Sequence, residues 1–296
     1  MSNSTKASQR GSICLEDAAL LAHTHLAAGQ HVIRLQAPRC ASRATAGSFV
    51  HLQCDTTIRM RRPLSIMRVD SAAGWIEVLY KEVGAGMVAL SRRRVGEQLS
   101  VLGPIGHGFT PHPERPRVLA IGGGVGIPPM VFLSEVLRAD RRAEWRPLVL
   151  MGSEIPFPFT TRPSRILVPG LPPEVIACMP LLDEWGVPSR LATRAGFAGC
   201  FDGWITDLAR TWLSSLSAAQ LQQTEIFSCG PTPMLAAIAK LARSFDLPCQ
   251  VSLEEYMACA VGGCAGCAVR VNTPEGPAMK RVCVDGPVFD ARLVFD

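Results

Sequence analysis

The chain has 296 residues, enough for two domains and a small third unit, and its hydrophobic fraction of 48% is typical of well-packed cores, not of a disordered protein. Its net charge of +5 is modest and no basic stripe is interleaved with aromatic residues, so we expect no nucleic-acid partner. Eleven cysteines without an apolar signal region indicate a reducing compartment, which predicts a cytoplasmic protein. The most apolar window, 118–133, is short and broken by glycine and proline, so no membrane span is expected.

The N-terminal third has the pattern of an antiparallel barrel. Residues 1–10 are polar and are predicted to be disordered. From there to residue 111, short β-type runs are separated by turn residues. A proline-rich segment, 111–116, is the expected hinge, so we assign the barrel domain to 11–111. Its clearest predicted strands are 31–35, 48–52, 75–80 and 98–102.

Two segments of this predicted barrel have groups suited to a phosphate-bearing ligand. In the first, an arginine can fork onto a phosphate and a serine hydroxyl can bond a polar ring atom. In the second, a strand end is followed by a flexible glycine loop whose backbone amides can admit a second phosphate. A structural turn and a plain glycine hairpin remain the alternatives. The residues are Arg62, Pro63, Leu64 and Ser65 in the first segment, and Leu79, Tyr80, Lys81, Gly84, Gly86 and Met87 in the second.

The next segment alternates strands and helices, which predicts an α/β nucleotide-binding domain at 112–248. A buried strand is expected at 117–121, a helix at 128–139 and a second strand at 147–151. The turn between the first strand and the helix is typical of a pyrophosphate site, although it is not the standard dinucleotide fingerprint. Its glycines are Gly122, Gly123, Gly124 and Gly126.

A second strand-to-helix turn follows downstream, between an expected strand at 225–227 and a helix ending near residue 243. Both turns would lie at the carboxyl edge of one parallel sheet, where α/β sheets bind ligands. The cysteine in this turn is either a contact for a nicotinamide ring or an inert buried thiol. The turn contains Cys229, Gly230, Pro231 and Met234.

The most specific motif is a set of four cysteines in the C-terminal segment, 249–296. They follow the pattern C-x4-C-x2-C with a fourth further on, which is the plant-type spacing for a [2Fe-2S] cluster. The small residues of the loop let backbone N–H groups approach a cluster. Structural zinc is the alternative, but it usually takes two C-x2-C pairs and only one occurs here. The predicted ligands are Cys259, Cys264, Cys267 and Cys283.

In this order the motifs resemble the ferredoxin-NADP reductase superfamily and, within it, the electron-transfer subunits of NAD-dependent (class 1B) dihydroorotate dehydrogenases. The resemblance implies an antiparallel flavin-binding barrel, a parallel-sheet nucleotide-binding domain and a small C-terminal [2Fe-2S] domain. Met87 departs from the pattern, because it stands where the family usually has threonine. The matching segments are 62–65 for the flavin motif, 84–87 for a Gly-x-Gly-Thr loop, 101–106 for the barrel end, 122–129 and 229–231 for the nicotinamide nucleotide, and 252–289 for the cluster domain.

The resemblance also implies a function. FAD held by Arg62 and Ser65 would exchange a hydride with NAD(H) and pass single electrons to the cluster. Ser65 and Cys229 would then lie closest to the reacting rings. The implied partner is an FMN-containing dihydroorotate dehydrogenase catalytic subunit, in a heterotetramer with two copies of each chain, serving pyrimidine biosynthesis. The alternatives are a sister subunit that serves ferredoxin, a hydrogenase or another oxidoreductase, and a non-catalytic zinc-containing interaction module.

The choice between NAD and NADP depends on the longer, proline-rich segment 151–203. Glu154 follows the second strand, where an acid can bind the ribose hydroxyls of NAD. Arg162 and Arg165 lie nearby and equally suit a 2′-phosphate. The position of Glu154 favours NAD.

Overall fold

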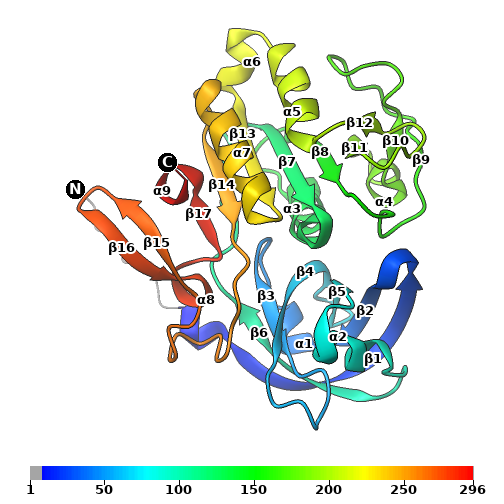
Figure 1. The fold of residues 1–296 in the computed structure, drawn as a ribbon, viewed down its shortest axis with the longest axis vertical. Coiled ribbons are helices and arrows are strands. Elements are labelled where there is room, and N and C mark those ends of the chain that lie inside the picture. The colour runs from blue at the N-terminus through cyan, green and yellow to red at the C-terminus, as the bar shows by residue number, and fades with distance from the viewer. Residues whose placement is uncertain (1–8, 296) are drawn as a thin grey trace.

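The computed structural model describes residues 9–295 and has a barrel below a nucleotide-binding sheet, with a small unit at one side (Figure 1). The barrel is closed, with strand order β1-β2-β5-β4-β3-β6. The predicted disordered segment 1–10 lies outside the described residues except for Gln9 and Arg10, which begin η1. The elements are η1 (Gln9–Ser12), β1 (Cys14–Leu26), η2 (Ala27–Gly29), β2 (Gln30–Gln36), α1 (Pro38–Ala41), β3 (Phe49–Leu52), β4 (Arg62–Asp70), β5 (Trp75–Lys81), α2 (Gly84–Ser91) and β6 (Gln98–Ile105).

All four strands predicted in this region are present, as β2, β3, β5 and β6. The barrel also contains β1 and β4, and β4 begins at Arg62, so the alternative of a structural turn at 62–65 is wrong. The predicted flexible loop and the glycine hairpin at 83–87 are wrong too, because Gly84 begins helix α2. Met87 and Leu90 pack into the barrel core, and this burial stabilises the helix where glycine alone would favour a loop.

The nucleotide-binding sheet has the order β12-β11-β8-β7-β13-β14-β17, and all its pairs are parallel except β14 with β17. Alternate residues of β7 face opposite sides: Val118 and Ala120 pack with α3, and Leu119 packs with α5 and α7. The elements are β7 (Arg117–Gly123), η3 (Gly124–Gly126), α3 (Ile127–Ala139), β8 (Arg146–Gly152), β9 (Arg162–Pro163), β10 (Ala177–Cys178), α4 (Pro180–Glu184), β11 (Ser189–Thr193), β12 (Phe201–Asp202), α5 (Ile205–Ser214), α6 (Ala218–Gln222), β13 (Thr224–Cys229), α7 (Thr232–Ser244) and β14 (Cys249–Ser252).

The C-terminal segment leaves this sheet, forms a hairpin and returns to it. Its elements are β15 (Ala268–Thr273), β16 (Gly276–Arg281), α8 (Val282–Asp285), β17 (Val288–Asp290) and α9 (Ala291–Val294). The hairpin β15–β16 projects to one side of the molecule (Figure 1). Because β17 pairs with β14, the segment is fixed to the nucleotide-binding sheet at both ends. The predicted domain boundaries at 111 and 249 stay predictions.

Barrel and sheet are joined by an ion pair between β4 and α3. The Nε atom of Arg68 lies 3.4 Å from an oxygen of Glu135, and the backbone N–H of Val69 donates to the other oxygen at 3.4 Å. Burial raises the pKa of Glu135, although Arg68 opposes this shift. Within residues 9–295, no helix is long and apolar enough to cross a membrane.

Candidate functional site

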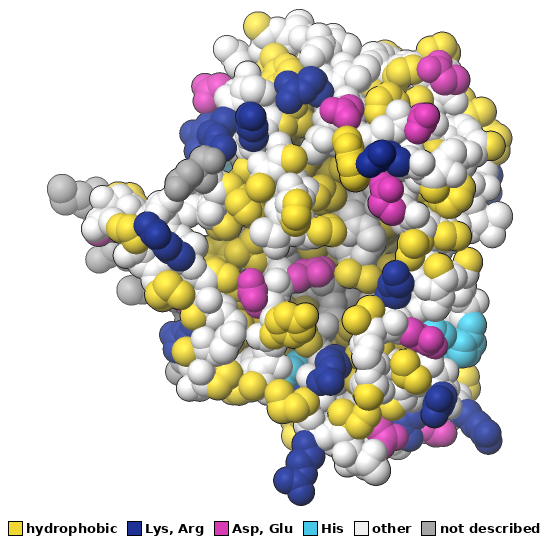
Figure 2. All heavy atoms as spheres, viewed as in Figure 1, with side chains coloured by type: hydrophobic (Ala, Val, Ile, Leu, Met, Phe, Trp, Pro, Cys, Tyr) yellow, Lys and Arg dark blue, Asp and Glu magenta, His cyan; other side chains and the backbone are white. Residues whose placement is uncertain are grey.

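The space-filling view shows a hollow between the barrel and the nucleotide-binding half, with acidic and apolar side chains around it (Figure 2). Arg62 begins β4 and packs against the first turn of α2, where a Cβ on Gly86 would lie 3.1 Å from its Nε atom. Its Nη1 donates to the carbonyl oxygens of Met60, at 2.9 Å, and Arg61, at 3.2 Å. Among the described residues no carboxylate pairs with Arg62. Its positive charge therefore stays available to an anion.

The first turn of α2, residues 84–86, lies beside Arg62, and we call the two together the phosphate cradle. The unpaired backbone N–H groups at a helix N-terminus attract anions, and here they adjoin the guanidinium of Arg62. Gly84 has φ of +73° and open space where a Cβ would stand, so a ligand can approach its backbone. Met87 is buried in the barrel core. At this position, where the predicted pattern has a threonine hydroxyl, the chain therefore has a buried apolar side chain and no hydroxyl.

The other predicted flavin contacts differ in their exposure. Pro63 and Ser65 are half-buried on β4, where a cofactor can reach them, and Leu64 is more deeply buried. Leu79 and Tyr80 are buried in the barrel core, with only 3% and 1% of their surfaces exposed. Of the three residues predicted at that strand end, Lys81 is the one that is partly exposed.

The two predicted nucleotide turns do lie side by side. Strands β7 and β13 are neighbours, and Gly122 is in register with Cys229. The turns touch backbone to backbone, because a Cβ on Gly126 would overlap the carbonyl group of Cys229. Met234 covers both turns and leaves no room for a Cβ on Gly123 or on Gly230. The backbone contact at Gly126 excludes any side chain, and a Cβ at Gly123 or Gly230 would displace the end of the Met234 side chain.

Gly124 is the exception within this group. It has φ of +54°, and nothing lies within 4 Å of the position its Cβ would take. The adjoining helix α3 begins at Ile127, with prolines in its first turn. The open backbone at Gly124 and the N-terminus of α3 make this edge of the sheet suitable for a pyrophosphate.

A carboxylate that the sequence analysis did not single out lies next to Cys229. The Sγ atom of Cys229 is 3.9 Å from an oxygen of Glu254, which follows β14 at the same carboxyl edge. Burial raises the pKa of both groups, so the Cys229 thiol is a neutral group and not a nucleophile. No strand was predicted at 249–252, so nothing local in the sequence marked Glu254 as a residue of this edge.

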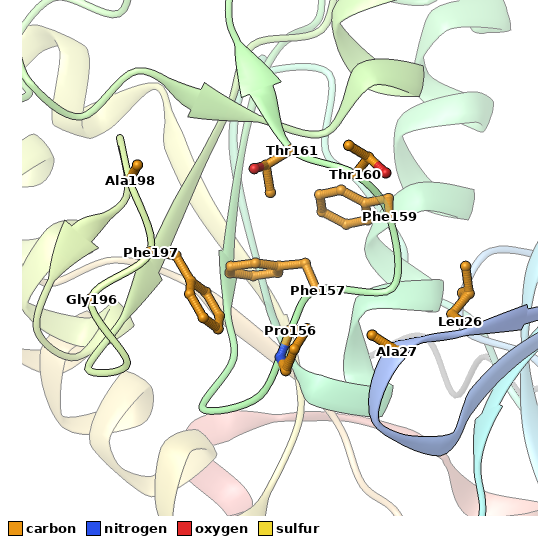
Figure 3. Close-up of a pocket in the computed structure, with 10 residues that line it drawn as sticks. All are labelled: Leu26, Ala27, Pro156, Phe157, Phe159, Thr160, Thr161, Gly196, Phe197 and Ala198. Atoms are coloured by element: carbon orange, nitrogen blue, oxygen red, sulfur yellow. The ribbon is translucent and has the colours of Figure 1, made fainter.

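A pocket of about 480 Å³ lies beyond the carboxyl end of β8, between the β1–β2 hairpin and the segment 156–161 (Figure 3). Three of its ten lining residues are aromatic, namely Phe157, Phe159 and Phe197. The ring of Phe157 stacks near Phe159, with centroids 5.6 Å apart, and meets Phe197 edge-on at 6.4 Å. No role was predicted for this segment, and the run Phe157-Pro-Phe159 is its one local indication of an aromatic pocket.

The four predicted cluster cysteines come together in two pairs. Cys267 and Cys283 are buried with their sulfurs 3.3 Å apart, where α8 meets the start of β15. Cys259 and Cys264 form the second pair, in which the backbone N–H of Cys264 donates to the sulfur of Cys259 at 3.4 Å. Two pairs of thiolates fit the two irons of a [2Fe-2S] cluster, one pair to each iron.

Backbone amides surround the sulfurs of this loop. Burial alone would raise the pKa of Cys259, but N–H groups of Val261, Cys264 and Gly263 outweigh it and lower the pKa to about 6. The pKa of Cys283 is raised, first by burial and then by Cys267. Thiolates that accept N–H hydrogen bonds are those that iron–sulfur sites use.

The loop backbone is curled to make these contacts. Ala260 and Ala265 both have φ of +55°, a conformation that costs a residue with a Cβ some strain. At Gly266 a Cβ would lie 3.5 Å from the sulfur of Cys264, and the Gly266 N–H donates to that sulfur at 3.4 Å. The donor set and the loop geometry therefore fit a [2Fe-2S] cluster.

Comparison with known proteins agrees with this geometry. Residues 254–295 match the iron–sulfur cluster binding domain of dihydroorotate dehydrogenase B. The electron transfer subunit of dihydroorotate dehydrogenase B (NAD(+)) from Shouchella clausii is 31% identical over 275 residues, which cover 91% of this chain and 94% of that one. The chain belongs to this family of electron transfer subunits. Its counterpart from Desulforamulus reducens is 30% identical, over 92% of this chain and 95% of that one.

Solved structures show the same fold. An NADH-dependent reduced ferredoxin-NADP oxidoreductase, studied for flavin-based electron bifurcation, superposes with a TM-score of 0.74 at 23% identity, over 94% of this chain and 90% of that one. The ferredoxin reductase of carbazole 1,9a-dioxygenase has a TM-score of 0.61 at 20% identity, over 80% and 67% of the two chains. The predicted combination of barrel, parallel sheet and iron–sulfur domain is confirmed for this member of the family.

We predict that Cys283→Ser loses the cluster while the flavin stays bound. The serine hydroxyl is a poor substitute for a thiolate, and the phosphate cradle lies on the barrel, outside this loop. Iron and acid-labile sulfide of the purified variant should fall to a small fraction of the wild-type content. Cys200→Ser, a half-buried cysteine outside the loop, is the control and should keep both. Unchanged iron and sulfide in Cys283→Ser would refute the ligand assignment.

We also predict that Arg62→Ala weakens flavin binding. A charge-assisted contact to phosphate contributes about 1.5–3 kcal/mol, so FAD affinity should fall roughly tenfold or more. The measurement is the FAD-to-protein ratio after gel filtration, with the exposed Arg59→Ala as a control of equal charge change. Equal FAD occupancy in Arg62→Ala and in the wild type would contradict the cradle.

Proposed function

We propose that this family member passes electrons between NAD(H) and an FMN-containing dihydroorotate dehydrogenase catalytic subunit, through FAD and its own [2Fe-2S] cluster. The observation that carries the proposal is the path of the chain after β14. Glu254 lies beside Cys229 at the nucleotide edge, and Cys259 in the cluster loop is only five residues further on. Five residues span at most about 18 Å. The nicotinamide edge and the cluster are therefore held close together by covalent structure.

The barrel contacts the C-terminal segment at two places. His51 on β3 lies close to the backbone of Met257, within the short path from Glu254 to Cys259. Just after β6, the backbone N–H of His107 donates to the carbonyl oxygen of Gly286 at 2.6 Å, and His107 forms a β-bridge with Pro287. The phosphate cradle, the nucleotide turns and the cluster loop thus surround one junction. When bound there, FAD would take two electrons from a hydride donor and release them singly.

Each group of residues has a distinct task in this proposal. Arg62 and the α2 amides bind the flavin phosphates, and Ser65 offers a hydroxyl to the flavin ring. The glycine turns at 122–126 and 229–231 bind the nucleotide pyrophosphate at the sheet edge. The neutral thiol of Cys229 provides a small uncharged surface for a ring, because burial raises its pKa and keeps it protonated. The cluster thiolates hold the one-electron outlet.

NAD is favoured over NADP by the charges beyond β8. Arg165 donates to Asp183 at 2.9 Å, and Arg162 lies 3.5 Å from the same carboxylate and 3.3 Å from Glu184. Both arginines are thus paired within the protein. Glu154 is exposed directly after β8, where it can accept the ribose hydroxyls of NAD and would repel a 2′-phosphate. The aromatic pocket beside it suits the adenine ring.

The partner would meet the chain at the cluster loop. Cys264 is exposed there, and Val261 and Tyr256 expose 38% and 94% of their surfaces on either side of Cys259. Exposed aromatic and apolar side chains next to an electron outlet are suited to a docking surface. We propose that a catalytic subunit covers this loop in a heterotetramer with two copies of each chain. The cysteine content favours the reducing cytoplasm as its location.

We predict that the purified chain reduces artificial dyes with NADH but does not oxidise dihydroorotate. Addition of the cognate FMN-containing subunit should produce dihydroorotate-dependent reduction of NAD+, because that subunit supplies the substrate site. The control is the same mixture with Cys283→Ser, in which the coupled rate should be lost while flavin-dependent dye reduction persists.

The result that would contradict the proposal is equally specific. If the two proteins neither co-purify nor couple, and ferredoxin or a hydrogenase subunit accepts electrons from the same preparation, then the chain serves a different oxidoreductase.

A further inference from the structure

Three histidines converge at one end of the barrel. His23 and His25 lie on β1, and His31 lies on β2 directly opposite His25. A nitrogen from each of the three rings lies within 4.8 Å of the other two. Tyr80, which is paired with His31 across β2 and β5, stacks on the His31 ring with centroids 4.9 Å apart. The flavin, nucleotide and cluster assignments give these histidines no task.

Hydrogen bonds fix the protonation of the His31 ring. Its Nε2 atom lies 3.0 Å from a carboxylate oxygen of Glu82, which can only accept, so Nε2 carries the proton. Its Nδ1 atom then has a free lone pair. That atom is buried, with no partner in the described protein, and His31 itself is only 3% exposed. A buried nitrogen without a partner points to a ligand.

His23 is fixed in the same way. Its Nδ1 atom lies 2.9 Å from the carbonyl oxygen of Arg93, which accepts the proton of that nitrogen. Its Nε2 atom therefore accepts a hydrogen bond from the hydroxyl of Tyr80, 3.0 Å away, and a metal ion would replace this bond. The exposed ring of His25 stacks on His23, with centroids 4.4 Å apart, and can rotate toward the other two.

We propose that His23, His25 and His31 bind one divalent transition-metal ion, of which zinc is the best match. Neutral imidazole nitrogens are zinc ligands, and three of them with a water molecule form a known zinc arrangement. The Glu82 carboxylate on the far nitrogen of His31 is the second-shell contact that orients a ligating histidine and raises its basicity. Closing the three nitrogens, now within 4.8 Å of one another, onto an ion at about 2.0–2.1 Å requires the rings to move closer and the Tyr80 hydroxyl to release His23.

The test uses the full chain with its cluster and flavin loaded, because empty cluster cysteines would themselves bind zinc. Zinc is titrated against a competing chelating dye, and metal content is measured with iron as the internal reference. We expect one zinc per chain in the wild type and at least a tenfold weaker affinity in His25→Ala, whose exposed side chain can be removed without disturbing the core. Glu82→Gln should weaken binding about ten- to a hundredfold. His112→Ala, a histidine paired with Glu225 elsewhere, should not change it.

X-ray absorption at the zinc edge gives an independent readout. Nitrogen and oxygen neighbours without sulfur would support the histidine site. Sulfur neighbours, an affinity equal in wild type and His25→Ala, or no zinc bound by cluster-loaded protein would each overturn it.

Discussion

The short covalent path from the end of β14 to the cluster loop is the constraint on which the arrangement of sites depends. It begins beside the nucleotide turns, where Glu254 lies against Cys229, and ends at Cys259. The pairing of β17 with β14 closes the loop, so the cluster cannot swing away from the sheet without breaking strand hydrogen bonds. Electron transfer needs such a fixed, short separation, and here the fold supplies it without depending on a flexible linker.

The nucleotide edge depends on glycine for a related reason. Gly126 lies against the Cys229 carbonyl, and Gly123 and Gly230 lie against Met234, so the two turns occupy the space that side chains would fill. Close backbone packing of this kind leaves N–H groups at the edge of the sheet facing a ligand. The cluster loop differs, because a Cβ at Gly263 or Gly266 would make only ordinary contacts with cysteine sulfurs, at 4.0 and 3.5 Å.

Much of this could be predicted from the sequence, because the signals were local. The spacing of the four cysteines identified the cluster loop, and the strand–glycine–helix order located both nucleotide turns before their register was known. Other features depend on tertiary packing. Strand β1 is rich in alanine and leucine, which lack strand preference, and it forms only because it pairs with β2 and β6 to close the barrel.

Helix α2 and the contact of Glu254 with Cys229 were not predictable for the same reason. The helix begins with glycines, which are typical of a loop. It forms because Met87 is buried against the barrel, and that burial stabilises the helical conformation. The burial of Leu79 and Tyr80 depends on packing too, because consecutive strand residues face opposite sides and both sides of this strand end are covered. The pairing of β17 with β14 joins segments 36 residues apart and has no local sequence signal.

The central claim is that one chain connects the nicotinamide edge to the cluster. The most direct measurement is electron paramagnetic resonance of the loaded chain, frozen after anaerobic mixing with NADH. We expect the signal of a reduced [2Fe-2S] cluster on mixing with NADH alone, and the loss of that signal in protein stripped of flavin. A cluster that chemical reductant can reduce, but that stays oxidised when NADH has fully reduced the flavin, would contradict it.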